Sequence, residues 1–213
     1  FLFRKINRDP NTEARKGFEE ANEWVEAQQN GHVKDSLNNQ PEINHRNRAR
    51  NSQWEPPPSG WLKCNFDSGF IKGRDYTTTG WIIRDETGHM VSSGCAKLQQ
   101  SHSALQAEAL GFLHVLQVVW MQGHRCVWFE GDNSELVRLI NSNGNHIKIG
   151  TLLYDIHQWR TKLPLSSLHH VNREKNVAAD MLSKRAPSIN SMYETFTVPP
   201  IWLVNYLYHP FTI

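Results

Sequence analysis

The sequence has few cysteines, no long hydrophobic run and little net charge. Its three cysteines (Cys64, Cys95 and Cys126) lie far apart without a CxxC pair. This spacing argues against a disulfide framework or a thiolate zinc site, and we expect small buried thiols in a reducing intracellular compartment, the nucleus being one candidate. No apolar run approaches the ~20 residues that span a bilayer, and Phe1-Leu2-Phe3 is too short for a signal-peptide core. We therefore expect no membrane segment.

Charge and length set further limits. A formal net charge of +2 over 213 residues gives no strong electrostatic argument for nucleic acid as the partner. The length allows one good-sized domain with appendages. Because the chain begins with Phe1 rather than Met, we expect a processed product or a fragment of a longer reading frame.

Composition divides the chain into three parts. Within residues 1–53, apolar residues recur at helical spacing over 13–29, which predicts an amphipathic helix, and a polar linker rich in Asn, Gln, Arg and His follows. A basic arm that contacts phosphates is the alternative for this linker. Residues 54–187 form the folded domain, which begins with a proline-rich segment. Residues 188–213 form an aromatic tail that we expect to dock on this domain or on a partner.

Hydrophobic periodicity predicts alternating strands and helices within the domain. The first three strands are short and follow one another through turns, so they should form an antiparallel meander. The longest helix has a broad apolar surface and should pack across the sheet. In chain order the predicted elements are strands 61–67, 80–84 and 90–96, helix 103–122, strand 126–132, helices 133–142 and 152–163, strand 165–171 and helix 176–184.

Two of these strands end on a carboxylate. Strand 61–67 alternates apolar side chains toward one face and ends at Asp67. Strand 126–132 ends at Asp132, directly before a helix start. Ligand crevices in open α/β sheets lie at the carboxyl ends of strands, so the two acids would meet there if their strands are parallel neighbours.

Two further acids lie on helices that can cover this edge. Glu108 lies in the second turn of helix 103–122, and Asp180 lies in helix 176–184. Taken singly, each acid is more commonly structural or solvated. Four carboxylates in one crevice, however, repel one another strongly unless cations lie between them. Hard oxygen ligands select Mg²⁺ or Mn²⁺, and two ions about 3.5–4 Å apart would clamp the attacking water and the leaving oxygen of a phosphodiester.

A family resemblance is carried by five segments in order. They are Leu62–Asp67, Gly80–Asp85, Gln106–Leu110, Glu130–Asn133 and His170–Lys184. Together they resemble the type 1 ribonuclease H family, in particular the plant RNase H-like domain found alone or at the end of non-LTR retrotransposon reverse transcriptases. The resemblance covers residues 54–187. It implies an α/β, RNase H-like fold with a five-stranded mixed sheet, three antiparallel strands and then two parallel ones, and helices on both faces.

The resemblance also implies the roles of site residues. Asp67, Glu108, Asp132 and Asp180 match its metal-binding tetrad, which would hold two Mg²⁺ or Mn²⁺ ions. His170 matches a mobile histidine that assists proton movement or product release. A one-residue slip would put the adjacent His169 in its place.

Contacts to nucleic acid are less sharply indicated. A nuclease of this kind recognises duplex shape, phosphates and 2′-hydroxyls. Gln106 and Asn133 near the crevice, with Lys63, Lys72 and Arg74 as exposed cations, are the candidates, and ordinary solvated surface is the alternative for each. The basic handle helix of bacterial and animal relatives is not evident, which argues against tight independent binding of a hybrid.

These observations lead to one main functional hypothesis and two alternatives. The main hypothesis is a metal-dependent endoribonuclease that cuts the RNA strand of an RNA–DNA hybrid. The first alternative is a catalytically weak or inactive retroelement-derived module that binds nucleic acid or a protein. The second is a fragment of a larger reverse-transcriptase polypeptide that is active only when tethered to its polymerase.

Overall fold

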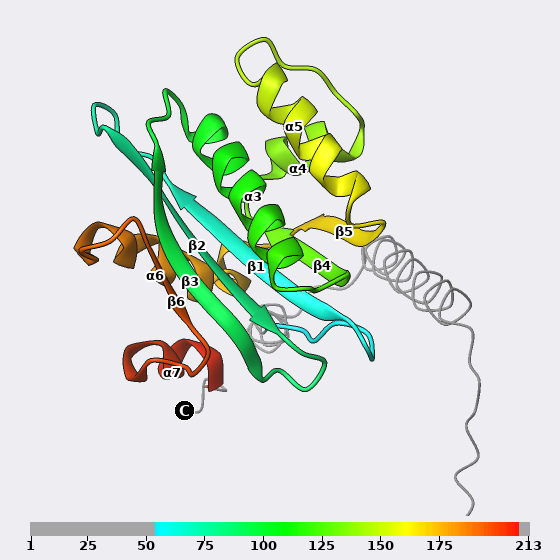
Figure 1. Ribbon diagram of the computed structural model, residues 1–213, viewed down its shortest axis with the longest axis vertical. Helices are drawn as coiled ribbons and strands as arrows, with labels where there is room; N and C mark the ends of the chain where they lie inside the picture. The colour runs from blue at the N-terminus through cyan, green and yellow to red at the C-terminus, as the bar shows by residue number, and fades with distance from the viewer. Residues whose placement is uncertain (1–53, 209–213) are drawn as a thin grey trace, which may run out of the picture.

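A six-stranded mixed sheet forms the centre of the fold, with helices on both faces (Figure 1). The computed structural model describes residues 54–208, so the predicted helix 13–29 and the linker after it lie outside the described residues. The strand order is β5-β4-β1-β2-β3-β6. The elements are β1 (Leu62–Gly69), β2 (Tyr76–Arg84), β3 (Met90–Gln99), α3 (Ala104–Met121), β4 (Cys126–Gly131), α4 (Ser134–Asn141), α5 (Gly150–Thr161), β5 (Leu165–His170), the 3₁₀ turn η1 (Arg173–Lys175), α6 (Val177–Arg185), the 3₁₀ turn η2 (Ala186–Ser188), β6 (Tyr193–Phe196) and α7 (Ile201–Tyr208).

The central strand β1 joins the antiparallel and parallel halves of the sheet. It pairs antiparallel with β2, which pairs antiparallel with β3, so the predicted meander is confirmed. On its other side β1 pairs in parallel with β4, and β4 pairs in parallel with β5. The register places Asn65 opposite Glu130. Asp67 and Asp132, each two residues further along, therefore leave the sheet at the same edge.

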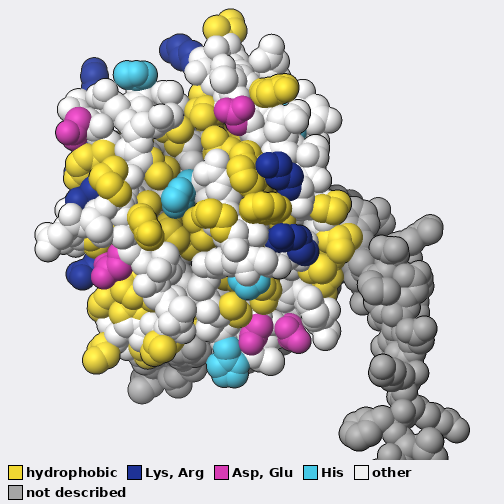
Figure 2. All heavy atoms as spheres, in the orientation of Figure 1, with side chains coloured by type: hydrophobic (Ala, Val, Ile, Leu, Met, Phe, Trp, Pro, Cys, Tyr) yellow, Lys and Arg dark blue, Asp and Glu magenta, His cyan; other side chains and the backbone are white. Residues whose placement is uncertain are grey.

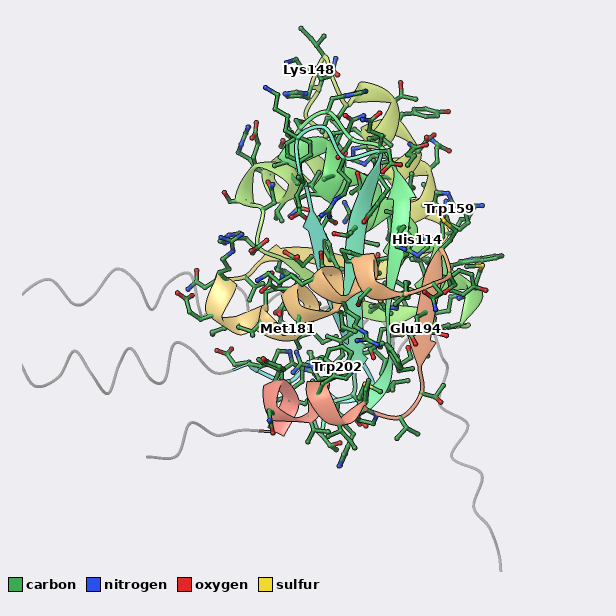
Figure 3. All side chains as sticks on the ribbon, turned by 90° about the vertical axis from the view of Figure 1, so that its left-hand side faces the viewer. His114, Lys148, Trp159, Met181, Glu194 and Trp202 are labelled. Carbon is green, nitrogen blue, oxygen red and sulfur yellow. The ribbon has the colours of Figure 1, made fainter. Side chains whose placement is uncertain are left out.

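The expectation of a five-stranded sheet is wrong, because the C-terminal tail adds a sixth strand. β6 has four residues and pairs antiparallel with β3, with Thr195 opposite Gly94. A segment this short shows no periodicity of its own, and the open edge of β3 supplies its hydrogen bonds. α7 then packs against α6 and buries Leu203 completely, and Figure 3 shows Trp202 of α7 below Met181 of α6. The described part of the tail, residues 188–208, thus docks on this domain.

Helix α3 is the core helix. The Ser103 side chain caps it by accepting a hydrogen bond from the Gln106 N–H. The buried residues of α3 pack against β1, β2 and α5, and Phe112 stacks on Phe66 of β1 with ring centroids 4.9 Å apart. Among residues 54–208, α3 is the one helix whose length and composition would suit a membrane span, and its burial is that of a core helix.

The second face of β1 is also covered, which corrects the expectation for Lys63. Its side chain points away from the apolar face, as alternation predicts, but it is 1% exposed and its Nζ lies 2.6 Å from Glu130 Oε1. Asn65 donates to the other Glu130 oxygen (2.9 Å), and Arg84 donates to Asn65 Oδ1 (2.8 Å). β1 is a central strand, so both of its faces are buried. Burial lowers the pKa of Lys63, while Glu130 opposes that effect.

Residues 54–58, here called the strap, cover this network. Trp54 Nε1 donates to Asn65 Oδ1 (2.9 Å), and the Arg84 guanidinium lies 3.8 Å from the centre of the Trp54 ring system. Glu55 Oε1 lies 2.6 Å from Lys175 Nζ in η1. The strap therefore links the start of the domain to the loop that follows β5.

Most other elements lie close to their predicted residues. β2 is the main exception, because it begins at Tyr76 rather than at Gly80. The added segment includes three consecutive threonines that are buried although polar, and a polar segment of this kind gives no apolar alternation. Cys64 and Cys95 are buried as expected, whereas Cys126 is only partly buried, and all three thiols are free.

Candidate functional site

Three of the four predicted acids meet at the carboxyl edge of the sheet. Asp67 lies near the end of β1, Asp132 follows β4, and Glu108 comes from α3. Their carboxylate oxygens lie within 4.8 Å of one another. We call these residues the three-acid cluster. Asp67 and Glu108 are each 7% exposed and, with Asp132, line a cavity of about 900 Å³.

The backbone around Asp132 holds this acid close to β1. A Cβ at Gly131 would lie 2.6 Å from the Phe66 ring, so a glycine allows β4 to approach β1 at this point. Asn133 then caps α4, because its Oδ1 accepts from the Leu136 N–H (2.9 Å). Asp132 is thereby fixed between a strand end and a helix start, as the sequence predicted.

Burial and mutual repulsion raise the pKa values of two of the acids. Burial, with Asp132 and Asp180 nearby, raises the pKa of Asp67 to about 6. Burial and the other two acids of the cluster raise the pKa of Glu108 well above its usual range, although the Ser68 N–H donates to its carboxylate. Glu108 Oε2 is buried and has no hydrogen-bond partner within the described part of the chain. A hard divalent cation fits this donor set, because it would satisfy the unpartnered oxygen and offset the repulsion.

Asp180 lies on the wall of the same cavity but outside the three-acid cluster. Its Oδ2 is 2.6 Å from Lys184 Nζ, one turn later in α6. It is nevertheless close enough to Asp67 to help raise the pKa of that acid. The Lys184 side chain is 67% exposed, so it can turn toward solvent and release Asp180 for a ligand role.

Arg173 faces the three-acid cluster, although no sequence pattern singles it out. Its Nε lies 3.2 Å from Asp132 Oδ2, and its side chain is 84% exposed. Arg173 belongs to the segment His170–Lys184, which contains several basic residues whose spacing alone does not distinguish them. Together with Lys184 it places positive charge on the wall of the cavity.

The two adjacent histidines lie in different surroundings. His170 is exposed and lines the cavity, and its Nε2 lies 3.2 Å from the carbonyl oxygen of Asp132. His169 packs on Trp128 with ring centroids 4.7 Å apart. Burial, followed by the charges of Lys63 and Arg160, lowers the pKa of His169 to about 4. Because side chains alternate along β5, one histidine reaches the cavity while its neighbour packs beside the covered network.

Only some of the residues predicted to contact nucleic acid line the cavity. Asn133 and Arg74 line the cavity. Gln106 does not line it, and its Oε1 instead accepts from the N–H of His102 (2.8 Å), the residue before the N-cap Ser103. Lys72 is exposed in the loop between β1 and β2. The roles of these residues toward nucleic acid stay predictions.

A family model described as reverse transcriptase-like matches residues 65–186. This match covers more than half of the chain, including the three-acid cluster and Asp180. No curated protein matches the chain.

Solved structures resemble the fold at low sequence identity. RNase H1 from the archaeon Halobacterium salinarum is 19% identical with a TM-score of 0.56, covering 61% of this chain and 98% of that one. LC11-RNase H1, solved in complex with an RNA/DNA hybrid, is 20% identical with a TM-score of 0.54, covering 59% and 95%. The protease-reverse transcriptase of prototype foamy virus is 16% identical with a TM-score of 0.50, covering 63% of this chain and 22% of that one. At such identities these likenesses establish the fold.

Proposed function

The chain belongs to the reverse transcriptase-like family, and from this premise we propose that it is a ribonuclease H that hydrolyses the RNA strand of an RNA–DNA hybrid. One observation carries the proposal. Three carboxylates from three separate elements converge within 4.8 Å at a cavity, and one buried oxygen among them has no hydrogen-bond partner within residues 54–208. Stability alone gives no reason for such an arrangement, because like charges in a crevice destabilise the fold.

We assign the roles as follows. Asp67, Glu108 and Asp132 hold the cations, and Asp180 joins them when Lys184 turns away. Two bound Mg²⁺ or Mn²⁺ ions would supply the positive charge that stabilises the developing charge on phosphate, as in a type 1 enzyme. His170, at the cavity wall beside the Asp132 carbonyl, is placed to move a proton to or from the reacting phosphodiester.

The substrate class is supported by the site and by a structural relative. The LC11 enzyme was crystallised with an RNA/DNA hybrid and shares this fold. Here the cavity combines acids that suit cations with Arg74, Arg173 and Lys184, which suit phosphates. A nucleic-acid backbone needs both kinds of group at one place.

We further propose that the domain acts within a larger reverse-transcriptase polypeptide in an intracellular compartment, the nucleus included, and in a plant retroelement context. On the face shown in Figure 2, the Lys and Arg side chains of the described residues lie apart from one another without a continuous basic stripe. Tight binding of nucleic acid depends on many phosphate contacts, and a tethered polymerase domain would add contacts to those at the cavity. The foamy virus relative is a protease-reverse transcriptase, which provides a precedent for this arrangement.

The test is cleavage of a labelled RNA–DNA hybrid with Mg²⁺ or Mn²⁺. We expect the wild-type chain to cut the RNA strand and Asp132→Asn to lose this activity by at least ~100-fold, because one ligand charge is removed while the shape is kept. The matched control is Asp75→Asn, which changes an exposed acid in the loop between β1 and β2 and should retain cleavage. If the folded wild type binds the hybrid without cutting it, the binding-module alternative replaces the nuclease.

A further inference from the structure

Helix α6 approaches the sheet unusually closely beside the cavity. A Cβ at Gly80 of β2 would lie 2.1 Å from the Ser183 backbone nitrogen and 2.6 Å from the Ala179 carbonyl oxygen. Real Cβ atoms do not reach such distances, so Gly80 allows this contact. The close approach brings Ser183, one turn after Asp180, into the cavity lining.

The Ser183 hydroxyl lies within a buried chain of polar groups that leads to the three-acid cluster. Ser183 is 1% exposed and lines the cavity together with Asp67, and its side chain acts as a hydrogen-bond donor that lowers the pKa of Asp67 against the effect of burial. On its other side, Thr78 Oγ1 lies 3.3 Å from Ser183 Oγ. A Cβ at Gly69 would lie 2.3 Å from Thr78 Oγ1 and 3.5 Å from Ser183 Oγ. The two hydroxyls therefore occupy a space that is available because residue 69 is a glycine.

A buried hydroxyl with two polar neighbours has little rotational freedom. If Thr78 donates to Ser183, the Ser183 proton points at Asp67, and the carboxylate is fixed in one rotation. α6 thus contributes both an acid, Asp180, and a donor that orients a second acid.

We propose that Ser183 is a positioning residue that orients the Asp67 carboxylate for a divalent cation. The inference rests on the proposed function only in its requirement for a cation at the three-acid cluster. Ser183 acts through Asp67 and needs no contact with the substrate. Outer partners of this kind commonly change metal affinity 10–100-fold when they are removed.

The experiment is calorimetric titration of the folded chain with Mg²⁺, for wild type and Ser183→Ala. We expect Ser183→Ala to weaken Mg²⁺ binding 10–100-fold. Ser93→Ala is the matched control, because it removes a hydroxyl from a buried serine of β3 outside the cavity, and it should leave Mg²⁺ affinity within about twofold. Urea unfolding of the same variants separates loss of affinity from loss of fold, and Ser183→Cys, which keeps the side-chain volume, replaces Ser183→Ala should the latter fail to fold.

A double-mutant cycle makes the claim specific to Asp67. In an Asp67→Asn background, Ser183→Ala should cause no further loss of Mg²⁺ affinity. An unchanged affinity in folded Ser183→Ala, an equal loss in both backgrounds, or no Mg²⁺ binding by wild type would each overturn the inference. If wild type binds Mg²⁺ and Ser183→Ala binds it weakly, but neither cleaves a hybrid, the proposed function fails while the positioning role stands.

Discussion

Arg173 Nε lies 3.2 Å from Asp132 Oδ2, so a guanidinium pairs with one acid of the three-acid cluster. Lys184 stands in the same relation to Asp180, at 2.6 Å. Both basic side chains are mostly exposed and reach the acids from the cavity wall. They offset part of the repulsion among the acids, and under the proposed function they would become available for phosphate groups when a cation binds.

Replacing Arg173 should therefore have opposite effects on metal and on substrate. Arg173→Gln removes a competitor for Asp132, and because exposed ion pairs contribute only ~0.2–1 kcal/mol, Mg²⁺ affinity should rise by no more than about fivefold. Hybrid binding, measured in Ca²⁺ or EDTA, should weaken and depend less steeply on salt, because one phosphate contact is lost. Arg138→Gln, on the exposed side of α4, is the control and should change neither quantity. Weaker Mg²⁺ binding by Arg173→Gln would contradict the competition.

Glu108→Gln should make the metal-free domain more stable. A buried carboxylate whose pKa is raised by burial and by other acids destabilises the folded state at neutral pH, and the neutral amide removes that repulsion. We expect the free energy of unfolding in EDTA to rise by on the order of 1–2 kcal/mol, and the added stabilisation by Mg²⁺ to disappear. Urea titrations with and without Mg²⁺ measure both effects. Glu86→Gln, in the exposed turn after β2, should behave like wild type.

His169 should make the domain sensitive to mild acid. Burial lowers its folded pKa to about 4 from an ordinary value of 6.5, so the unfolded chain binds a proton that the folded domain excludes. The contribution of His169 to the free energy of unfolding is thus fully present above pH 6.5. It is lost as the pH falls toward 4, by up to about 3 kcal/mol. The raised pKa of Asp67 has the opposite effect on the pH dependence of stability. The contribution of His169 is therefore isolated by comparing wild type with His169→Phe, which keeps a ring packed on Trp128.

Urea unfolding at pH 7.5 and pH 5 tests this prediction. Between pH 7.5 and pH 5, wild type should lose more free energy of unfolding than His169→Phe. His102→Gln, at an exposed position before α3, serves as the control and should follow wild type. Identical pH dependence in wild type and His169→Phe would exclude His169 as the titrating group.

The strap should contribute to the stability of the domain through Trp54. Trp54→Phe keeps a ring near Arg84 but removes the indole donor to Asn65, and should cost about 1 kcal/mol. Trp54→Ala also removes the stacking and should cost roughly 2 kcal/mol. Trp120→Ala, at a more exposed tryptophan at the end of α3, is the comparison. Equal free energies of unfolding for wild type and Trp54→Ala would show that the contacts of Trp54 do not stabilise the domain.

The C-terminal tail should be part of the cooperative fold. Leu203 of α7 is fully buried against the sheet side of α6, so Leu203→Ala should lower the free energy of unfolding by 2–4 kcal/mol. Val204→Ala, at the next residue but with a 36% exposed side chain, should cost less than about 1 kcal/mol. Similar small effects of both substitutions would show that α7 detaches before the domain unfolds.

Local signals in the sequence predicted the parts of the site that depend on local structure. Strand alternation and the helix start after Asp132 placed two acids at strand ends, and the parallel pairing of β1 with β4 confirms that these ends adjoin. Helix periodicity placed Glu108 on a helix able to cover this edge, the resemblance assigned it to the metal-binding set, and it lies in the same cluster. These features depend on neighbours a few residues away, so a single sequence contains them.

Features that depend on distant neighbours were missed. Lys63 was expected in solvent, because alternation shows which way a side chain points but not what covers it, and here the strap does. β6 depends on the free edge of β3, and the Arg173 ion pair depends on how η1 folds over Asp132. Asp180 lies outside the three-acid cluster and pairs with Lys184, and spacing along the chain reveals neither feature.

The parallel pairing of β1 with β4 has a consequence for protein synthesis. Asp67 is made early in the domain, Asp132 much later, and α6, which closes the cavity, near the end. β1 cannot complete its pairing until β4 has emerged from the ribosome, and long-range pairings of this kind form late. A nascent or prematurely terminated chain that stops before Val177 holds the three acids without the wall of α6. The cavity is therefore complete, with its acids, Asp180 and the wall of α6 together, only when translation of the domain is nearly finished.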